Sequence, residues 1–222
     1  LAATALALAA TFVLLPRIIF SSAYADMRLL PFAVAVAILA IRVPEARRLA
    51  KRLAIGGLLF ALARIAVTTV VFADYGASFD RQLQALSVIP SGARVLSLIG
   101  MPCDARWATA RHQHLAAMAI VRRDAFTNDQ WEMPGARLLT VRYRAAVPYA
   151  YDPSQMVPVP TRCRSEPQVG LKETLAGFPR DAFDYVWMVD IPRAQWPRDP
   201  SLMPIWQKGE GIVYRIVRRQ GG

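Results

Sequence analysis

The strongest constraint on the fold is an unbroken apolar run at residues 53–72, in which Arg64 is the one charged residue. A helix that crosses a bilayer needs about 20 residues of this kind. Two further apolar runs precede it, at residues 1–15 and roughly 29–43, and the helix expected for the second covers about 24–43. Three such runs in succession, separated by charged turns, are not typical of buried soluble helices. We therefore expect about three transmembrane helices in residues 1–74, with the lipid bilayer as their partner.

Residues 75–222 have the composition of a globular domain, with 13 of the 16 prolines and all five tryptophans. Apolar, β-branched runs bounded by Gly and Pro predict strands, and a Gly-Glu-Gly turn near the end predicts a hairpin. Alternating strands and helices indicate an α/β domain with a mixed sheet. The expected strands are 94–99, 137–143, 184–191, 203–207 and 212–217; the expected helices are 79–86, 108–126 and 171–175; residues 145–167 are expected to form a long loop.

The formal net charge is +11, of which +5 falls in residues 1–74 and +6 in the remainder. The basic residues do not form a run interleaved with aromatics, so nucleic acid is not an expected partner. The densest basic cluster comprises Arg47, Arg48, Lys51 and Arg52, between the second and third apolar runs. Cytoplasmic loops carry an excess of Lys and Arg. This loop is therefore expected in the cytoplasm, and the domain of residues 75–222 outside it, which in a bacterium means an inner-membrane protein with a periplasmic C-terminal domain.

The chain begins with Leu1, inside an apolar run. A secretory signal peptide would have a charged start and a small-residue cleavage site after a short apolar core, and neither is present. We expect the sequence to be the C-terminal part of a longer polytopic protein, with earlier helices before Leu1.

Three charged residues of the apolar part are candidate ligand-binding residues. Arg64 lies at the middle of the third run, where an arginine costs about 2.5–3.5 kcal/mol on insertion scales. It is either a cation for a lipid phosphate or acidic ligand, or a structural residue that pairs with a carboxylate or extends to the interface. Asp26 and Arg28, between the first two runs, are either interface anchors or part of a site at the membrane surface.

The two cysteines, Cys103 and Cys163, both fall in the half expected outside the cytoplasm. An oxidising compartment favours a disulfide between them, and two separate buried thiols are the alternative. Neither belongs to a CxxC pair, and a zinc site needs about four ligands. No metal and no cofactor are expected.

His112 and His114 would point in different directions on a helix over residues 108–126, with His114 on the apolar face as a core histidine. Asp190 ends a predicted buried strand, where catalytic residues of α/β sheets often lie, but a capping or turn aspartate before Pro192 is the favoured interpretation. The sequence contains no GxSxG, HExxH or Walker motif. No catalytic residue is assigned from the sequence, and the domain is interpreted as an accessory or recognition domain.

Several segments together resemble a known family: YADMRLLPF, PSGARVLSLIG, FPRDAFDYVWMVD and IWQKGEGIVYRI. The whole chain resembles the C-terminal third of bacterial polytopic membrane proteins of the GT-C glycosyltransferase type, and the ends of many sphingomonad-like membrane proteins. The resemblance implies transfer of a sugar from a polyprenyl-phosphate donor to a glycan or lipid acceptor. It implies a catalytic acidic residue before Leu1, and Arg28 and Arg64 as counterparts of arginines that hold lipid phosphate. The alternative from the sequence is a non-enzymatic, membrane-anchored periplasmic domain that binds a partner or scaffolds an assembly.

Overall fold

A computed structural model of the chain divides into two compact units, Leu1–Val71 and Phe72–Gly222. The structure describes residues 1–16, 18–19, 22–23, 25–41, 46–102, 111–132, 139–159 and 169–218. Each unit is considered by itself below. One helix, residues 47–83, contributes its first part to the first unit and its last part to the second.

The first unit contains three apolar helices: α1 (Ala2–Leu14), α2 (Ala25–Leu39) and the greater part of α3 (Arg47–Leu83). The strands β1 (Ile18–Ile19) and β2 (Ser22–Ala23) pair antiparallel and turn the chain between α1 and α2, which pack together. Most of the described apolar side chains of these helices are exposed. Among the described residues, one helical stretch, Arg47–Val88, has the length and composition to cross a membrane, whereas α1 and α2 are shorter.

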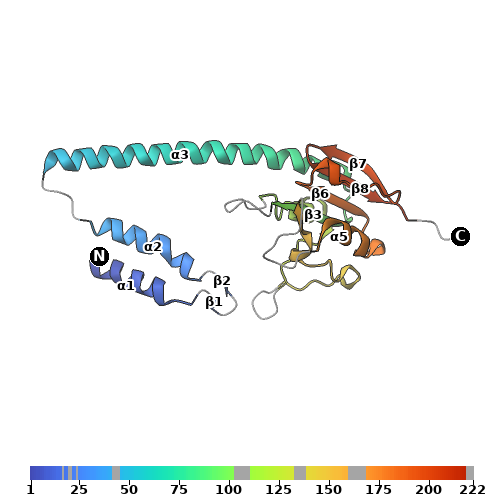
Figure 1. The fold of residues 1–222 in the computed structure, drawn as a ribbon, viewed down its shortest axis with the longest axis horizontal. Coiled ribbons are helices and arrows are strands. Elements are labelled where there is room, and N and C mark those ends of the chain that lie inside the picture. Colours follow the sequence, from blue (N-terminus) through green and yellow to red (C-terminus); the bar gives the residue numbers. More distant parts are fainter. Residues whose placement is uncertain are drawn as a thin grey trace. The chain divides into compact units, whose positions relative to one another are not determined.

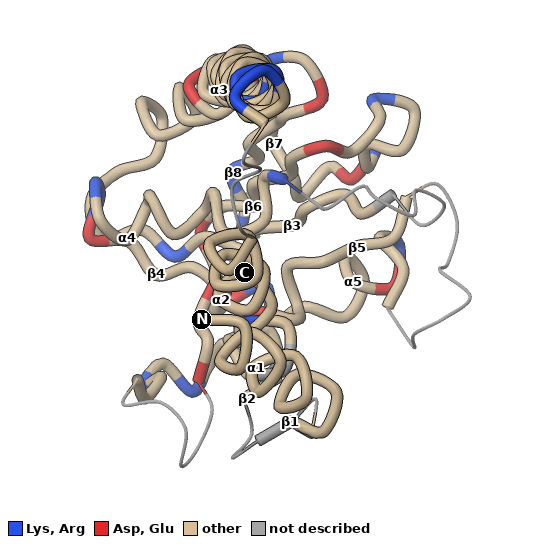
Figure 2. Tube along the Cα trace, turned by 90° about the vertical axis from the view of Figure 1, so that its left-hand side faces the viewer, with Lys and Arg blue, Asp and Glu red and all other residues tan. Residues whose placement is uncertain are grey.

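The bounds of α3 correct two expectations (Figure 1). The basic cluster that begins at Arg47 lies in the first turns of α3, where Figure 2 shows it in blue, and not in a loop. The helix expected at residues 79–86 is the end of α3, followed by the 3-10 turn η1 (Gln84–Val88). The change from apolar to polar composition after Phe72 marks the end of the apolar surface, not of the helix, because the first helix-breaking proline comes later, at Pro90.

The second unit is built on a mixed sheet, which confirms the predicted α/β domain. Its strand β3 is central: β6 pairs with one edge of β3, and β4 and β5 share the other edge, all in parallel. On the far side of β6, β8 and then β7 pair antiparallel as the predicted hairpin. The described strands are β3 (Arg94–Pro102), β4 (Phe126–Thr127), β5 (Met156–Val159), β6 (Tyr185–Val189), β7 (Leu202–Lys208) and β8 (Gly211–Ile216).

Both faces of this sheet are buried, which explains why β3 and β6 are continuous apolar runs. Leu96 and Leu98 of β3 face a core that includes α5 (Leu171–Gly177), as predicted near residues 171–175. Val95 and Ile99 point to the opposite core, which η1 and the helix α4 (Ala117–Arg123) cover. The alternation of side chains along a strand therefore supplies two cores from one segment.

A single asparagine completes the edge of β3 between the two short strands. Ser97 lies between the residues of β3 that pair with β4 and those that pair with β5. Asn128 Oδ1 accepts a hydrogen bond from Ser97 N at 2.7 Å, and Asn128 Nδ2 donates to Ser97 O at 3.0 Å. Both residues are fully buried. The side-chain amide thus satisfies the two backbone groups that a paired strand would otherwise satisfy.

Three predicted elements of this unit differ from the structure. The helix expected at residues 108–126 is reduced to α4, and residues 111–116 form turns; residues 103–110 lie outside the described part. Residues 139–143 form no strand, and 133–138 are not among the described residues. The expected long loop contains the strand β5, whose Pro158 is compatible with an edge position because it needs no ladder donor.

Candidate functional site

A cavity of about 410 Å³ opens at the carboxyl ends of the parallel strands β3 and β6. Ligands of open α/β sheets characteristically bind at this edge. The end of α3, the turn after β3 and the segment after β6 all contribute side chains, and every lining residue belongs to the second unit. The lining residues are Asp74, Tyr75, Ser78, Arg81, Gly100, Arg111, His112, Val159, Asp190, Pro192 and Glu210.

Three of these side chains form a hydrogen-bonded chain. Ser78 Oγ lies 3.0 Å from His112 Nε2, and His112 Nδ1 lies 2.7 Å from Asp190 Oδ2. An ionised carboxylate only accepts hydrogen bonds, so the proton of a neutral His112 belongs on Nδ1. Nε2 is then free to accept the hydrogen bond of the Ser78 hydroxyl. A nucleophile, a base and a group that orients the base are arranged here in sequence.

His112 is held in place from several sides. It is 8% exposed, and its imidazole ring packs against Phe79 with the ring centroids 5.1 Å apart. Phe79 follows Ser78 on α3, so the helix supplies both the hydrogen-bond partner and the packing surface. Asp190 fixes the other ring nitrogen. These contacts restrict the imidazole to one orientation.

Asp190 owes its position to a close approach between two strand ends. Its backbone has φ of 56°, in the left-handed region that aspartate tolerates better than most residues. A Cβ atom built on Gly100 would lie 1.9 Å from the Asp190 carbonyl oxygen. Only glycine therefore permits the end of β3 to approach the residue that follows β6. The chain turns at once, and the Asp190 carboxylate reaches His112.

The cavity lining combines both signs of charge with an aromatic ring. Asp74 and Glu210 contribute carboxylates, and Arg81 and Arg111 contribute guanidinium groups. The Arg111 guanidinium carbon lies 3.9 Å from the centroid of the Tyr75 ring, which is a cation–π contact. Such a lining offers hydrogen-bond donors and acceptors to a polar ligand, and positive charge to a group that becomes anionic.

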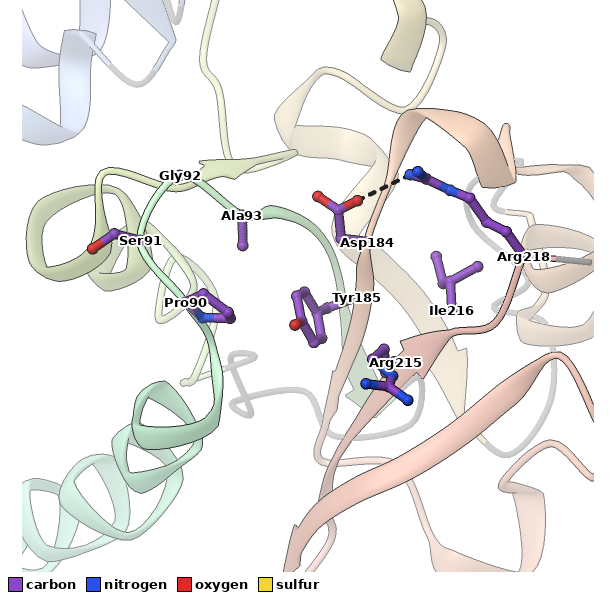
Figure 3. Close-up of a pocket in the computed structure, with 9 residues that line it drawn as sticks. All are labelled: Pro90, Ser91, Gly92, Ala93, Asp184, Tyr185, Arg215, Ile216 and Arg218. Carbon is purple, nitrogen blue, oxygen red and sulfur yellow. Dashed lines mark hydrogen bonds and ion pairs between the residues drawn. The ribbon is translucent and has the colours of Figure 1, made fainter. Parts of the chain in front are cut away.

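The amino ends of the same strands form a second, differently built hollow of about 500 Å³ (Figure 3). Asp184 lies in it, but Arg94 donates to this carboxylate through Nε at 2.9 Å, and Arg218 Nη2 lies 3.0 Å from Oδ1. Hydrogen bonds from Arg94 lower the pKa of the Asp184 carboxyl, and the same pairing raises the pKa of Arg94 above its usual range. The carboxylate is thus engaged in joining β3 to β6, and we assign this edge a structural role.

Sequence reasoning located one member of the candidate site. Asp190 was a candidate at the end of a buried strand, and the structure brings it into the cavity. His112 was missed, because the expected helix made His114 the buried histidine. The structure shows the reverse: His112 is buried and the His114 side chain is 51% exposed, since residues 111–116 form turns. Ser78 gave no signal, because a serine in a polar helical stretch is unremarkable.

The other candidates from the sequence are not among the described residues that line this cavity. Arg28 in α2 and Arg64 in α3 are exposed and belong to the first unit. The backbone of Asp26 lies in α2, but its side chain is outside the described residues. Cys103 and Cys163 also lie outside the described residues, so their disulfide stays a prediction.

The chain was compared with protein-family models, with curated proteins and with solved structures, and no match was found in any of the three. The site is therefore interpreted from its own geometry.

Proposed function

We propose that the second unit is an enzyme domain that activates a hydroxyl group for acyl transfer or ester hydrolysis. Ser78 is the nucleophile, His112 is the general base, and Asp190 is the positioning residue that holds the imidazole. The observation that supports this proposal is the Ser78–His112–Asp190 chain of hydrogen bonds in a cavity at the carboxyl ends of parallel strands. Such triads are recognised by geometry and roles, and they occur on unrelated folds.

The proposed reaction has two steps. Ser78 Oγ attacks the carbonyl carbon of an ester, and its proton passes to His112 Nε2. The tetrahedral oxyanion collapses, the bond to the leaving oxygen breaks, and that oxygen takes the proton from Nε2. Water or an acceptor hydroxyl then attacks the carbonyl carbon of the acyl-serine and loses its proton to Nε2. The bond from this carbon to Ser78 Oγ breaks, and Oγ takes the proton back from Nε2. Arg111, in the same lining, supplies positive charge for the oxyanion.

The proposed substrate class is an ester of a polar molecule. The lining presents carboxylates and guanidinium groups around the triad, so hydroxyl and amide groups of a substrate find partners there. A polar substrate can pair with these exposed charges, whereas a purely apolar acyl donor cannot. The polar part of the substrate is therefore expected in the cavity, with its ester carbonyl beside Ser78.

A fluorophosphonate probe tests the nucleophile directly, because it reacts covalently with activated serines. We expect the full chain in mild detergent to be labelled on Ser78, and Ser78→Ala to abolish the labelling. Ser87→Ala is the matched control: Ser87 is exposed, and among the described residues its Oγ donates a local hydrogen bond, to Gln84 O at 2.8 Å. Absence of labelling in the wild-type chain, or equal labelling of Ser78→Ala, would refute the proposed nucleophile.

The positioning role of Asp190 has its own test. In Asp190→Asn the amide can donate to Nδ1, which then places the imidazole proton on Nε2, where it no longer accepts from Ser78. In a triad this change lowers the rate by up to about 10⁴. We expect the labelling rate to fall by at least about 10²-fold and to recover partly at high pH, where serine ionises without the base. An unchanged rate and pH profile would remove Asp190 from the mechanism.

We also propose that the chain is a membrane protein in which the second unit is extracytoplasmic. The support is the composition of α3, with basic first turns followed by a long apolar stretch. α1 and α2 would be two further, shorter spans in a protein of the bacterial inner membrane. A membrane-impermeant thiol reagent applied to cells that carry Ser87→Cys, alongside a tag after Gly222, reports the side directly. Protection of both positions would place the domain in the cytoplasm.

A second candidate is the glycosyltransferase-like function implied by the sequence resemblance. It is favoured by Arg28, at the start of the apolar part of α2, and by Arg64, within the apolar stretch of α3, because these cations suit the phosphate of a polyprenyl-phosphate sugar donor. In that case the His112–Asp190 pair would receive the proton of an acceptor hydroxyl, and the catalytic acidic residue would lie before Leu1. Sugar transfer that survives Ser78→Ala but not Arg64→Leu would favour this candidate over the acyl-transfer enzyme. Ligand binding without turnover would favour a binding or scaffold domain instead.

A further inference from the structure

A second cluster of chemically active side chains lies outside the candidate site. It comprises His114 in the turns before α4, Asp129 shortly after β4, and Asp152 in the 3-10 turn η3 (Asp152–Gln155) that leads into β5. His114 Nδ1 lies 2.6 Å from Asp129 Oδ1 and 3.2 Å from Asp152 Oδ1. One oxygen or nitrogen atom from each of the three residues lies within 4.8 Å of the others.

One oxygen in this cluster has no hydrogen-bond partner among the residues that the structure describes. The Asp129 and Asp152 side chains are each only 2% exposed. Asp152 Oδ2 is buried and accepts no hydrogen bond from the described residues. The other oxygen of the same carboxylate lies 3.2 Å from His114 Nδ1, so this carboxylate belongs to the cluster. A buried carboxylate oxygen without a partner is expensive, and this oxygen therefore indicates that a ligand belongs here.

The two buried carboxylates of the cluster favour a cation as their partner. Two carboxylates are buried close together, since the Asp129 and Asp152 side chains are each 2% exposed and both lie within hydrogen-bonding distance of His114 Nδ1. Described groups within hydrogen-bonding reach of the two carboxylates include His114 and uncharged donors: Gln155 and the Ala117 backbone N–H. A neutral His114 would leave a formal charge of about two negative units. A divalent cation compensates this charge fully.

We propose that His114, Asp129 and Asp152 bind a divalent transition-metal ion of the Zn²⁺ class. Imidazole nitrogen together with carboxylate oxygen suits Zn²⁺, whereas Ca²⁺ and Mg²⁺ prefer oxygen ligands alone. Zn²⁺ holds such ligands at about 2.0–2.2 Å, which separates neighbouring ligand atoms by about 3.3 Å. The observed distances of 2.6 and 3.2 Å from Nδ1 need only a small rotation of His114, which its exposure permits. Three protein ligands leave a fourth position for water or a substrate group.

Gln155 is the positioning residue of this site. It is fully buried, and its Nε2 donates to Asp129 Oδ1 at 3.1 Å and also to Asp152 Oδ1. One amide therefore orients both carboxylates, as outer-shell groups do in metal sites. The ion would also connect the turns after β3 to the segment between β4 and β5, and so fix the turn that bears His112. The proposal does not depend on the function proposed for the cavity.

Calorimetric titration of ZnCl₂ into the full chain, stripped with EDTA and held in mild detergent, tests the site. We expect one ion to bind per chain, and Asp152→Asn to weaken binding by at least about 100-fold while preserving the shape of the side chain. Gln155→Leu should weaken binding by about 10–100-fold. His112→Gln is the matched control, since this histidine lies two residues away in a different site, and binding should be unchanged.

Three results would overturn the proposal. No heat of binding at Zn²⁺ concentrations up to about 100 μM would mean that the cluster does not bind Zn²⁺ with a Kd below about 100 μM. Binding that persists in Asp152→Asn and in His114→Gln would be an adventitious ion elsewhere on the chain. Equal binding of Ca²⁺ would exclude the imidazole as a ligand. A rise in the unfolding temperature with Zn²⁺ in the wild type, absent in Asp152→Asn, gives an independent readout.

Discussion

Replacing Asn128 by alanine removes the amide that satisfies the middle of β3, and its effect can be worked out from the contacts. Ser97 N and Ser97 O both bond to this side chain, at 2.7 and 3.0 Å, and both residues are fully buried. Leaving a buried polar group without its partner costs about 1–3 kcal/mol. The third bond, from Asn128 Nδ2 to Ser154 Oγ, adds little, since this hydroxyl also donates to Tyr151 O. We expect Asn128→Ala to lower the free energy of unfolding by about 2–6 kcal/mol.

Urea unfolding of the full chain in detergent, followed by tryptophan fluorescence, measures this loss. All five tryptophans lie in the second unit, and Trp187 in β6 is fully buried, so the signal reports the sheet domain. A loss of this size is a large part of the roughly 5–15 kcal/mol that stabilises a typical domain. The Ser97 amide should also lose its protection from hydrogen exchange.

Two variants separate the hydrogen bonds from the loss of volume. Asn128→Asp keeps an acceptor for Ser97 N but turns an oxygen toward Ser97 O and buries a charge, so it should destabilise at least as much as alanine. Gln130→Ala is the matched control: Gln130 is only partly buried and donates one bond, to Thr127 O at 3.1 Å, so its loss should be about 1 kcal/mol or less. If the free energy of unfolding of Asn128→Ala lay within about 0.5 kcal/mol of the wild-type value, the argument that this amide takes the place of a paired strand would be wrong.

Three further predictions concern the strand ends and the acid response. Gly100→Ala places a Cβ atom 1.9 Å from Asp190 O, so it should separate β3 from β6, destabilise the domain and slow fluorophosphonate labelling. Gly76→Ala is the control: its Cβ atom would meet nothing within 4 Å, and it should stabilise the helix by about 0.5–1 kcal/mol. Equal effects of the two substitutions on stability would contradict the steric argument. Arg94 lowers the pKa of Asp184 in the folded domain, so this carboxylate adds stability above the unfolded-state pKa near 3.9, and the added stability is lost as pH falls through the lower folded pKa. Asp184→Asn should therefore lower the free energy of unfolding at pH 7. The variant should also show a weaker dependence of this free energy on pH below about pH 4. If Asp184→Asn lost stability below about pH 4 as steeply as the wild type, the Arg94–Asp184 pair would not be the cause of that loss. His114→Gln should leave fluorophosphonate labelling of Ser78 within about threefold in the metal-free chain, because the two histidines contact different partners; a loss as large as in His112→Ala would merge the two sites.

The sequence alone determined the elements whose signals are local. The strands β3 and β6 and the hairpin of β7 and β8 follow from continuous apolar segments bounded by Gly and Pro, and each lies where it was expected. The apolar stretch within α3 follows in the same way. Its two ends did not, because composition reports the surface that a helix presents, whereas its length depends on where a breaker such as Pro90 first occurs.

Only the tertiary structure decided the two sites. Ser78, His112 and Asp190 are separated by 34 and 78 residues, and they meet because β3 and β6 pair in parallel up to Ile99 and Val189, which brings Gly100 next to Asp190. Residues 111–116 could be assigned to a helix from their periodicity, but His114 adopts a φ of 66°, which a helix does not contain. That one turn directs His112 inward to Asp190 and His114 outward to Asp129. A sequence pattern could not predict these orientations, because they depend on which carboxylate the sheet brings close to each histidine.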